Sequence, residues 1–489
     1  MTAAPTYLGV DVGTSMVKGA LFDPAGEVVA TAARPVPLSH PAPGRVEQDA
    51  DAVVQAAAEV LGSVAGSARQ RTGAAPEVVA VTGQGDGCWL VDGQGRPVRP
   101  AVSWMDGRAD VLLDAWSRDG VSEAVFRING NMLFPGAQAP ILRWLDQHEP
   151  GTLDRATTAA YCKDVVVQRL TGLRATDTSD ASLPFGDGAG GYSQDVLELC
   201  GLAHRSGLLP PVVQPLPYAP VTEQAARSTG LAPGTIVVTA PFDLPSCAVG
   251  GGVTTVGDGL LILGTTLACQ VLVDAPDLAG EPAGMHLATP APGRWLRAMP
   301  AMSGCASLDW TLSVLGLTHD ALDSTLAASV PGAGGVQVLP YLAPSGERAP
   351  FVDPAARGQY TGLQLTTTRE DLVRAMCEGL AHAARHCFEA AGLTGRLMVC
   401  GGGTRSRAWL QIFADVLNRP LHVVRGGEAG ARGAVLAALE VTGRSPDVPA
   451  WTRPDTVVEP DPARKAVHEE GYGRYLERVR AARAFGVTA

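Results

Sequence analysis

The sequence is poor in lysine, in aromatic residues and in the usual signatures of phosphate or zinc binding. Lysine occurs only at Lys18, Lys163 and Lys465, and none of the three stands in a Gly-Lys-Ser/Thr sequence. A Walker-type P-loop is therefore excluded. The nine cysteines include no Cys-x-x-Cys pair. This excludes a zinc ribbon and favours a reducing environment, so we expect a cytoplasmic protein.

Long hydrophobic runs and excess positive charge are absent as well. The longest apolar stretch, residues 259–273, is too short and too polar to span a bilayer, and no secretion signal opens the chain. A formal net charge of −11 argues against nucleic acids and anionic membranes as partners. With 46% hydrophobic and 18% charged residues, the 489-residue chain is typical of a globular enzyme. Its length predicts two domains of about 240 residues each.

The first informative pattern is a polar turn between two apolar runs at the N-terminus. Residues 7–12 and 17–22 are typical of β-strands, and the turn between them contains Gly13, Thr14 and Ser15. Glycine allows close backbone approach, so the N–H groups of such a turn can converge on a phosphate chain. Asp11, just before the turn, can hold hydrated Mg²⁺, which prefers oxygen ligands. The pattern predicts a nucleotide site without a P-loop.

The same pattern recurs half a chain later. Residues 259–263 lead into Gly264, Thr265 and Thr266, and a second β-type run covers 267–273. The two turn glycines lie 251 positions apart, about half the chain. Either turn alone could be an ordinary hairpin, because short glycine motifs often occur by chance. Together they indicate two similar halves that hold one triphosphate between them.

Three further strand-to-loop transitions complete the pattern. Residues 78–83 predict a buried strand before a glycine-rich loop at 84–87, and residues 234–240 predict a strand before Asp243. Residues 397–400 precede Gly401, Gly402 and Gly403, with an expected helix from about 409 to 417, so an anion or an adenosine can lie near the helix N-terminus. A tight packing turn is the alternative. Other helices are expected at 49–65, 142–145, 163–170, 371–391 and 428–434, and an exposed proline-rich connection at 210–220.

At this point the chain resembles the FGGY family of carbohydrate kinases over nearly its whole length. The resemblance to the C-terminal signature of that family is carried by Gly358, Tyr360, Gly362, Leu363, Asp371, Leu372, Ala375, Met376, Cys377 and Glu378, where Cys377 replaces a larger apolar residue. The N-terminal signature is similar at Gly136, Leu142, Trp144, Leu145 and His148, but Ile141 replaces the usual lysine. The resemblance implies an α/β fold of the duplicated actin/hexokinase-like (ribonuclease H-like) ATPase type. Its two expected domains, 1–251 and 252–489, would have a central cleft between them.

The resemblance also implies roles for individual residues. Asp243 matches the catalytic base of the family, although a helix cap is the alternative interpretation. ATP and Mg²⁺ are the expected cofactors, with Asp11 and Asp243 as metal ligands. We expect the N-terminal domain to bind the sugar and the C-terminal domain to bind adenosine. The expected nucleotide-binding residues are Asp11, Gly13, Thr14, Ser15, Lys18, Gly264, Thr265, Thr266, Gly304, Gly402, Gly403 and Ser406.

The substrate is expected to be a small sugar or sugar alcohol phosphorylated on a terminal hydroxyl. The stretches 82–87, 162–164, 174–177 and 346–352 resemble the erythritol kinase branch, whereas Asp243-Leu-Pro-Ser is also similar to L-xylulose kinases. D-Xylulose kinases have Gln-Met-His-Gly where this chain has Gln-Gly-Asp-Gly. The expected substrate-binding residues are Gln84, Gly85, Asp86, Trp104, Asp106 and Asp243, with Arg108 beside them. Simple turn formation remains the alternative for Asp86, and core packing for Trp104.

An ATPase of the actin/Hsp70 type without sugar kinase activity is the alternative function. The same phosphate turns would serve such a protein. The absence of a separate peptide-binding domain and the kinase signatures argue against it. The sequence leaves the oligomeric state open, with a homodimer as one candidate.

Overall fold

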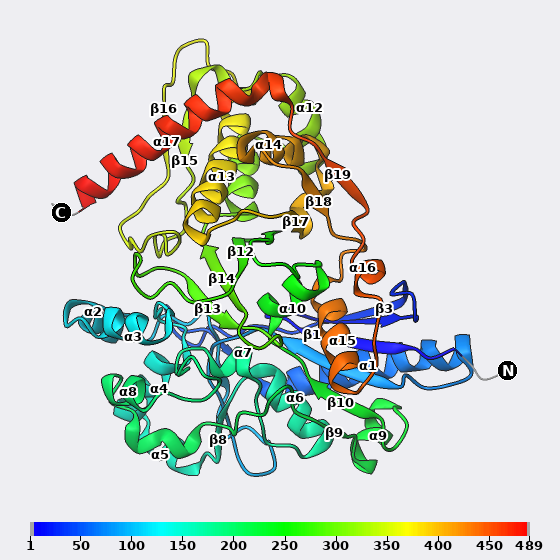
Figure 1. The fold of residues 1–489 in the computed structure, drawn as a ribbon. Coiled ribbons are helices and arrows are strands. Elements are labelled where there is room, and N and C mark those ends of the chain that lie inside the picture. The colour runs from blue at the N-terminus through cyan, green and yellow to red at the C-terminus, as the bar shows by residue number, and fades with distance from the viewer. Residues whose placement is uncertain (1–3, 487–489) are drawn as a thin grey trace.

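The computed structural model describes residues 4–486, and its two halves are built around two mixed sheets (Figure 1). In the first half the strand order is β3 (Val28–Pro35), β2 (Met16–Phe22), β1 (Tyr7–Val12), β5 (Val78–Gly83), β10 (Ile236–Thr239) and β9 (Tyr218–Pro220). In the second half it is β13 (Met285–Ala288), β14 (Trp295–Ala301), β12 (Leu267–Val273), β11 (Gly259–Leu263), β17 (Leu397–Cys400), β18 (Leu421–Val423) and β19 (Thr456–Val458).

The two sheets repeat one topology. Strands β1 and β11 each pair antiparallel with the next strand of their hairpin, β2 or β12, and parallel with β5 or β17 on the other side. Strands β10 and β18 then add in parallel beyond β5 and β17. This confirms the duplicated α/β fold, and the predicted bounds of β11 and β12 agree with the observed ones.

Small two-stranded sheets and helices fill the rest of the chain. The small sheets pair β4 (Glu47–Gln48) with β7 (Ala101–Val102), β6 (Trp89–Val91) with β8 (Thr158–Ala160), and β15 (Gln337–Leu339) with β16 (Gln359–Thr361). The helices are α1 (Ala50–Thr72), α2 (Asp110–Arg118), α3 (Val121–Asn129), α4 (Gln138–His148), α5 (Pro150–Arg155), α6 (Cys162–Thr171), α7 (Thr178–Ala181), α8 (Gln194–Leu199), α9 (Glu223–Thr229), α10 (Asp243–Gly250), α11 (Cys305–Val314), α12 (Leu322–Ala327), α13 (Arg369–Ala391), α14 (Arg407–Leu417), α15 (Ala429–Val441), α16 (Val448–Trp451) and α17 (Lys465–Gly486). Among residues 4–486, no helix has the length and apolarity needed to cross a bilayer.

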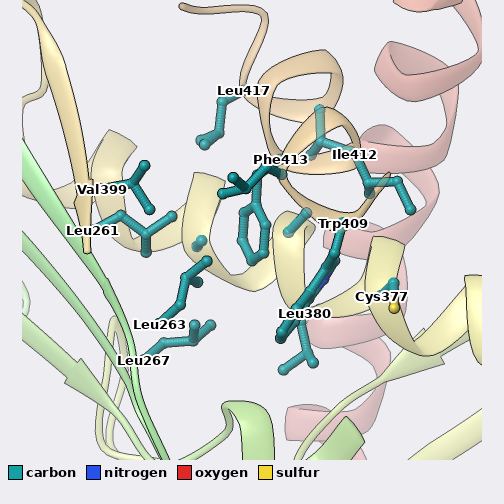
Figure 2. Packing of buried hydrophobic residues seen from close by; sticks show 14 of the residues in the cluster. Leu261, Leu263, Leu267, Cys377, Leu380, Val399, Trp409, Ile412, Phe413 and Leu417 are labelled. Carbon is teal, nitrogen blue, oxygen red and sulfur yellow. The ribbon is translucent and has the colours of Figure 1, made fainter. Parts of the chain in front are cut away.

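The longest helices begin and end where their capping residues predict. The side chain of Asp49 accepts hydrogen bonds from Asp51 N and Ala52 N at the start of α1. Thr368 and Asp371 form a capping box at the start of α13. On α13 and α14 the apolar faces point to the second sheet, where Phe413 and Trp409 lie between the strand residues Leu261 and Leu263 and the α13 residues Cys377 and Leu380 (Figure 2). Cys377 is therefore a core residue.

Each half lends one helix to the sheet of the other half. Helix α15, from the second half, packs its alanines and leucines on strands of the first sheet, including Phe22 and Val78. Helix α10, from the first half, packs Ala248 and Phe242 against the second sheet. Figure 1 shows both helices at the junction of the two halves, with α15 beside β1. This exchange was not predicted, because each helix reads locally as part of its own half.

The two exchanged helices touch through their backbones. A Cβ on Gly433 of α15 would collide with the carbonyl oxygen of Ser246 in α10, and a Cβ on Gly250 of α10 would collide with that of Ala429. The small residues of α10 and α15 therefore serve this crossing. The crossing brings the start of α15 to the end of β1.

One local prediction was wrong in detail. The connection at 210–220 is not wholly exposed, since Leu216 is buried and Tyr218–Pro220 form edge strand β9. The helix expected from about 409 to 417 agrees with α14, and a 3₁₀ turn over Gly402–Arg405 lies between it and the glycines. The difference at 210–220 arises because turn residues predict a break in the pattern but not what packs beside it.

Candidate active site

The two glycine turns occupy equivalent places in the two sheets. Gly13 N donates to Met16 O over 3.0 Å, and Gly264 N donates to Thr266 O over 3.2 Å. The second turn is held by the start of α11, where Cys305 N donates to Gly264 O over 3.0 Å and Ala306 N to Thr265 O over 3.1 Å. Gly304 lies directly against this turn, since a Cβ there would be 2.5 Å from Thr266 Cα.

Asp11 and Asp243 approach each other because of the strand order. Strands β1, β5 and β10 are parallel neighbours, so their carboxyl ends meet at one edge of the sheet. Asp11 lies at the end of β1, and Asp243 begins α10 just after β10. Burial, together with the negative charges of Asp11 and Asp86, raises the pKa of Asp243 to about 8. Burial also raises the pKa of Asp11 to about 6.

Asp11 has one oxygen without a partner. Among the described residues its Oδ1 is buried and makes no hydrogen bond. A Cβ on Gly430 of α15 would lie 2.9 Å from Asp11 Oδ2, so glycine keeps the space around this carboxylate open. Lys18 is the register partner of Asp11 on β2, and its positive charge lowers the pKa of Asp11. Lys18 and Ser15 are exposed.

Asp86 has a buried side chain with an unmet hydrogen-bonding need. It follows β5, has a left-handed backbone (φ 54°) and is 7% exposed. Its Oδ1 is buried without a partner in residues 4–486. Burial raises the pKa of Asp86 to about 7, although the positive charge of Arg348 opposes this rise. A carboxylate in such a place costs free energy unless a ligand pairs with it.

Four side chains from the first glycine turn and the loops near Asp86 are joined by hydrogen bonds. Trp104 Nε1 donates to Thr14 Oγ1 over 2.9 Å, and Thr14 Oγ1 donates to Gln84 Oε1 over 3.1 Å. Gln84 Nε2 donates to Gln48 Oε1 over 2.9 Å, and Gln48 Nε2 donates to Thr14 O over 2.8 Å. Thr14 thus links the first phosphate turn to the predicted sugar residues Gln84 and Trp104. Its hydroxyl is used within this network.

Close packing explains why residue 85 is a glycine. A Cβ on it would lie 2.6 Å from the ring of Phe242, the residue before Asp243. The backbone N–H of Phe242 in turn donates to Ser179 Oγ over 3.0 Å. The loop after β5 and the start of α10 are therefore fitted to each other.

Asp106 lies in an ion-pair network instead of presenting a free carboxylate. Its Oδ2 accepts from Val46 N over 2.6 Å, and its Oδ1 accepts from both Arg108 N and Arg108 Nε over 2.8 Å. Arg108 also pairs with Glu47 at 2.7 Å. With both oxygens used, Asp106 is suited to holding the loop that carries Trp104.

The residues predicted to bind adenosine differ in what surrounds them. A Cβ on Gly403 would lie 2.8 Å from Leu263 Cβ and 3.0 Å from the ring of Trp409, so this glycine serves packing. Gly402 is exposed, and a Cβ there would meet nothing within 4 Å. Ser406 caps α14 by accepting from Trp409 N over 3.1 Å, and its hydroxyl donates to Asp323.

Two features near the site were not assigned a role from the sequence. Arg348 reaches the loop of Asp86 from the second half of the chain. Lys163 of α6 is fully buried and pairs with Asp164, Asp177 and Asp180. The sequence did hold a signal for both, because their stretches resemble the erythritol kinase branch. Among the described residues, no cluster of three or more His, Cys, Asp or Glu side chains is arranged to hold a metal ion.

Two similar sheets, each with a glycine turn beside a parallel strand, define the actin/hexokinase-like class of ATP-using enzymes. Residues 6–250 match the N-terminal domain, and residues 260–440 the C-terminal domain, of the FGGY family of carbohydrate kinases. The chain belongs to this family. It is an ATP-dependent carbohydrate kinase that phosphorylates a sugar or polyol.

Named relatives cover almost the whole chain. The erythritol kinase of Brucella abortus (strain 2308) is 34% identical, over 96% of this chain and 95% of its own length. The xylulose kinase of Escherichia coli (strain K12) is 31% identical, over 88% and 89%. A crystal structure of a xylulose kinase from Rhodospirillum rubrum is 29% identical, with a TM-score of 0.88, over 98% of this chain and 99% of that one.

Proposed function

We propose that this kinase transfers the γ-phosphate of ATP to a terminal hydroxyl of a small, uncharged acceptor, either a tetritol such as erythritol or a pentulose such as xylulose. The observation that carries the proposal is the buried, unpartnered carboxylate of Asp86, beside Asp243 and the Trp104–Thr14–Gln84 network. A carboxylate accepts hydrogen bonds only, so it suits a substrate whose hydroxyls donate. The similarity to erythritol and xylulose kinases supports the same substrate classes.

In the proposed mechanism Asp243 is the general base. As the hydroxyl oxygen of the acceptor attacks the γ-phosphorus, its proton passes to the Asp243 carboxylate, and the bond from the γ-phosphorus to the bridging oxygen breaks to release ADP. The pKa of Asp243, raised to about 8, lies close to neutral pH, which suits a group that takes up a proton during the reaction. The turns at 13–15 and 264–266 would hold the phosphates through backbone N–H groups, and Lys18 would add positive charge near them.

Mg²⁺ fits the residues present, with Asp11 and Asp243 as its ligands. The buried Oδ1 of Asp11 has no partner among the described residues, and carboxylate oxygens are the donors that Mg²⁺ prefers. Mg²⁺ usually binds through one or two carboxylates, with water and substrate phosphates as further ligands, so a two-carboxylate site suffices. When bound, the ion would offset phosphate charge.

The two halves have separate tasks in this proposal. Residues 1–251 would carry the sugar residues, the first turn and the base, whereas residues 252–489 would carry the second turn and the adenosine surface around Gly402, Gly403 and Ser406. Movement at the α10–α15 crossing would close the halves over the substrates and exclude water, which would otherwise hydrolyse ATP. A homodimer is one candidate for the assembly.

A substrate screen tests the proposal. Tetritols, pentitols and pentuloses are incubated with ATP, and ADP release and the phosphorylated product are measured together. We expect one acceptor to give ADP and phosphorylated product in equal amounts, far above the rate without acceptor. ADP release at the same rate without any acceptor, and no phosphorylated product, would instead favour the actin/Hsp70-type ATPase.

A further inference from the structure

Arg348, a side chain of the second half, lies beside predicted sugar residues of the first. It lies between β15 and β16, more than 240 positions after Trp104. Its guanidinium carbon is 4.7 Å from the ring centre of Phe134 and 6.0 Å from that of Trp104. Its Nε donates to Pro300 O over 3.0 Å. Two rings of the first half and a carbonyl of the second therefore orient the guanidinium.

The backbone that carries Arg348 is fixed by its neighbour Glu347. Glu347 is 2% exposed, and its Oε1 accepts from Met302 N over 2.8 Å, Arg348 N over 2.9 Å and Ala349 N over 3.3 Å. A carboxylate that accepts three backbone N–H bonds holds a loop firmly. The position of the guanidinium is therefore set before a ligand binds.

Arg348 and Asp86 attract each other without forming an ion pair. The loop of Asp86 lies against Trp104, since a Cβ on Gly87 would be 3.2 Å from Trp104 N, and the ring of Trp104 is the one beside Arg348. Each of the two charges also favours the charged form of the other in its effect on the pKa. Their charged atoms do not come within 4.0 Å, and the only side-chain hydrogen bond of Arg348 to the described residues is the one from Nε to Pro300 O. Asp86 Oδ1 is buried and has no partner among the same residues. An acceptor and a group of donors thus lie beside the same ring of Trp104, and both are left to be satisfied.

We propose that Arg348 binds the substrate directly and, with Asp86, selects a neutral acceptor with two neighbouring hydroxyls. One hydroxyl donates to Asp86, and a neighbouring oxygen accepts from the Nη groups of Arg348. A sugar acid is disfavoured, because its carboxylate would lie beside the acidic side chains of Asp86 and Asp243. This inference rests on the proposed function and names a substrate contact from the other half of the enzyme.

A purely structural role for Arg348 makes different predictions. If the guanidinium only stacks on Phe134 and Trp104 to join the two halves, its loss should affect every acceptor and ATP alike. If it binds a hydroxyl, its loss should affect the acceptor that carries this hydroxyl and spare the KM for ATP. The experiment therefore compares acceptors with and without single hydroxyls.

The test uses Arg348→Met and Arg348→Lys, with Arg297→Met as the matched control. Arg297 is also a buried arginine beside an aromatic ring, 5.8 Å from the centre of Phe126, and has no proposed contact with substrate. For the best acceptor of the screen, Arg348→Met should lower kcat/KM by about 10- to 100-fold, the loss expected for a hydrogen bond to a charged group. Arg348→Lys should recover part of this, and Arg297→Met should stay within about threefold of the unmodified enzyme.

The second readout is a cycle with deoxy acceptors. The analogue that lacks the contacted hydroxyl should lose kcat/KM with the unmodified enzyme but lose little more with Arg348→Met, since the partner is already gone. Equal losses on the parent and on every deoxy analogue, or a change of less than about twofold in Arg348→Met, would overturn the inference. If Arg348→Met does not fold, Arg348→Lys serves for the same cycle.

The aldonic acid of the same chain length gives the charge test. The unmodified enzyme should prefer the neutral acceptor by at least about 100-fold, and Asp86→Asn should reduce this preference by about tenfold or more. Equal use of the aldonate by the unmodified enzyme would contradict the proposed selection. If the unmodified enzyme phosphorylates no polyol or ketose at all, the proposed function fails first, and this outcome is distinct from a failure of Arg348 alone.

Discussion

Replacing Lys163 by methionine should strongly destabilise the protein, because the change leaves three carboxyl groups buried without their cation. Lys163 Nζ lies 2.9 Å from Asp164 Oδ1, 2.9 Å from Asp177 Oδ1 and 2.7 Å from Asp180 Oδ2. The four side chains are at most 4% exposed. Burial raises the pKa of Asp180 well above its usual range, and the positive charge of Lys163 opposes this rise.

The size of the effect follows from the loss of one partner of a buried ion pair, about 3–5 kcal/mol. Protonation of the remaining carboxyls relieves part of this cost, so we expect about 3 kcal/mol at pH near 7. Burial also raises the pKa of Asp164. A carboxyl whose folded pKa lies above its unfolded value favours the folded state at low pH. The positive charge of Lys163 no longer opposes this in the variant, which should therefore regain stability as pH falls from about 7 to about 5.

Urea denaturation followed by circular dichroism measures the free energy of unfolding. Lys18→Met, which removes an exposed lysine, is the control for loss of charge. The double variant Lys163→Met/Asp180→Asn should recover part of the lost stability. The cluster also holds α7, whose Ser179 accepts from Phe242 N beside the base, so kcat should fall as well. A loss of less than about 1 kcal/mol in Lys163→Met would refute the reasoning.

Three further outcomes are expected. Asp86→Ala should lower kcat/KM for the acceptor by the factor that corresponds to a loss of about 1–3 kcal/mol per lost contact, with the KM for ATP little changed. An equal loss on all acceptors that follows the loss of stability would mean that Asp86 only shapes its turn. Gly402→Val should raise the KM for ATP more than that for the acceptor. Gly403→Val should mainly lower the melting temperature, because Leu263 occupies the space that the new side chain needs. The reverse pattern would show that the predicted position of adenosine is wrong. Burial lowers the pKa of His382 to about 3, so the protein should lose stability as pH falls below about 6.5. In urea titrations at pH near 5, His382→Gln should remove about 2 kcal/mol of that loss. An unchanged pH dependence would argue against a neutral, buried His382.

Local chemistry made much of the fold predictable. Alternating apolar runs around glycine turns gave both hairpins, because strand and turn propensities act over a few residues. The repeat of the turn predicted the duplication. The order of β1, β5 and β10 then explains why Asp11 and Asp243, far apart in sequence, come together.

The remaining features depend on contacts between distant segments. No local pattern shows that α15 covers the sheet of the other half, or that Gly403 is required by Leu263. The stretch of Arg348 resembles the erythritol kinase branch, but only the fold shows that this side chain lies beside the loop of Asp86. Asp106 was predicted to bind sugar, but its hydrogen bonds to Arg108 and Val46 favour a positioning role.

The most direct test of the account is the turnover of Asp243→Asn, which keeps the size of the side chain and removes its basicity. The phosphorylated acceptor and ADP are quantified for both enzymes at saturating ATP and acceptor, and ATP binding is measured separately. The account predicts a kcat lower by at least about 10²–10⁴-fold, with ATP affinity nearly unchanged. Phosphorylation at close to the original rate would contradict the assignment of Asp243 as the base.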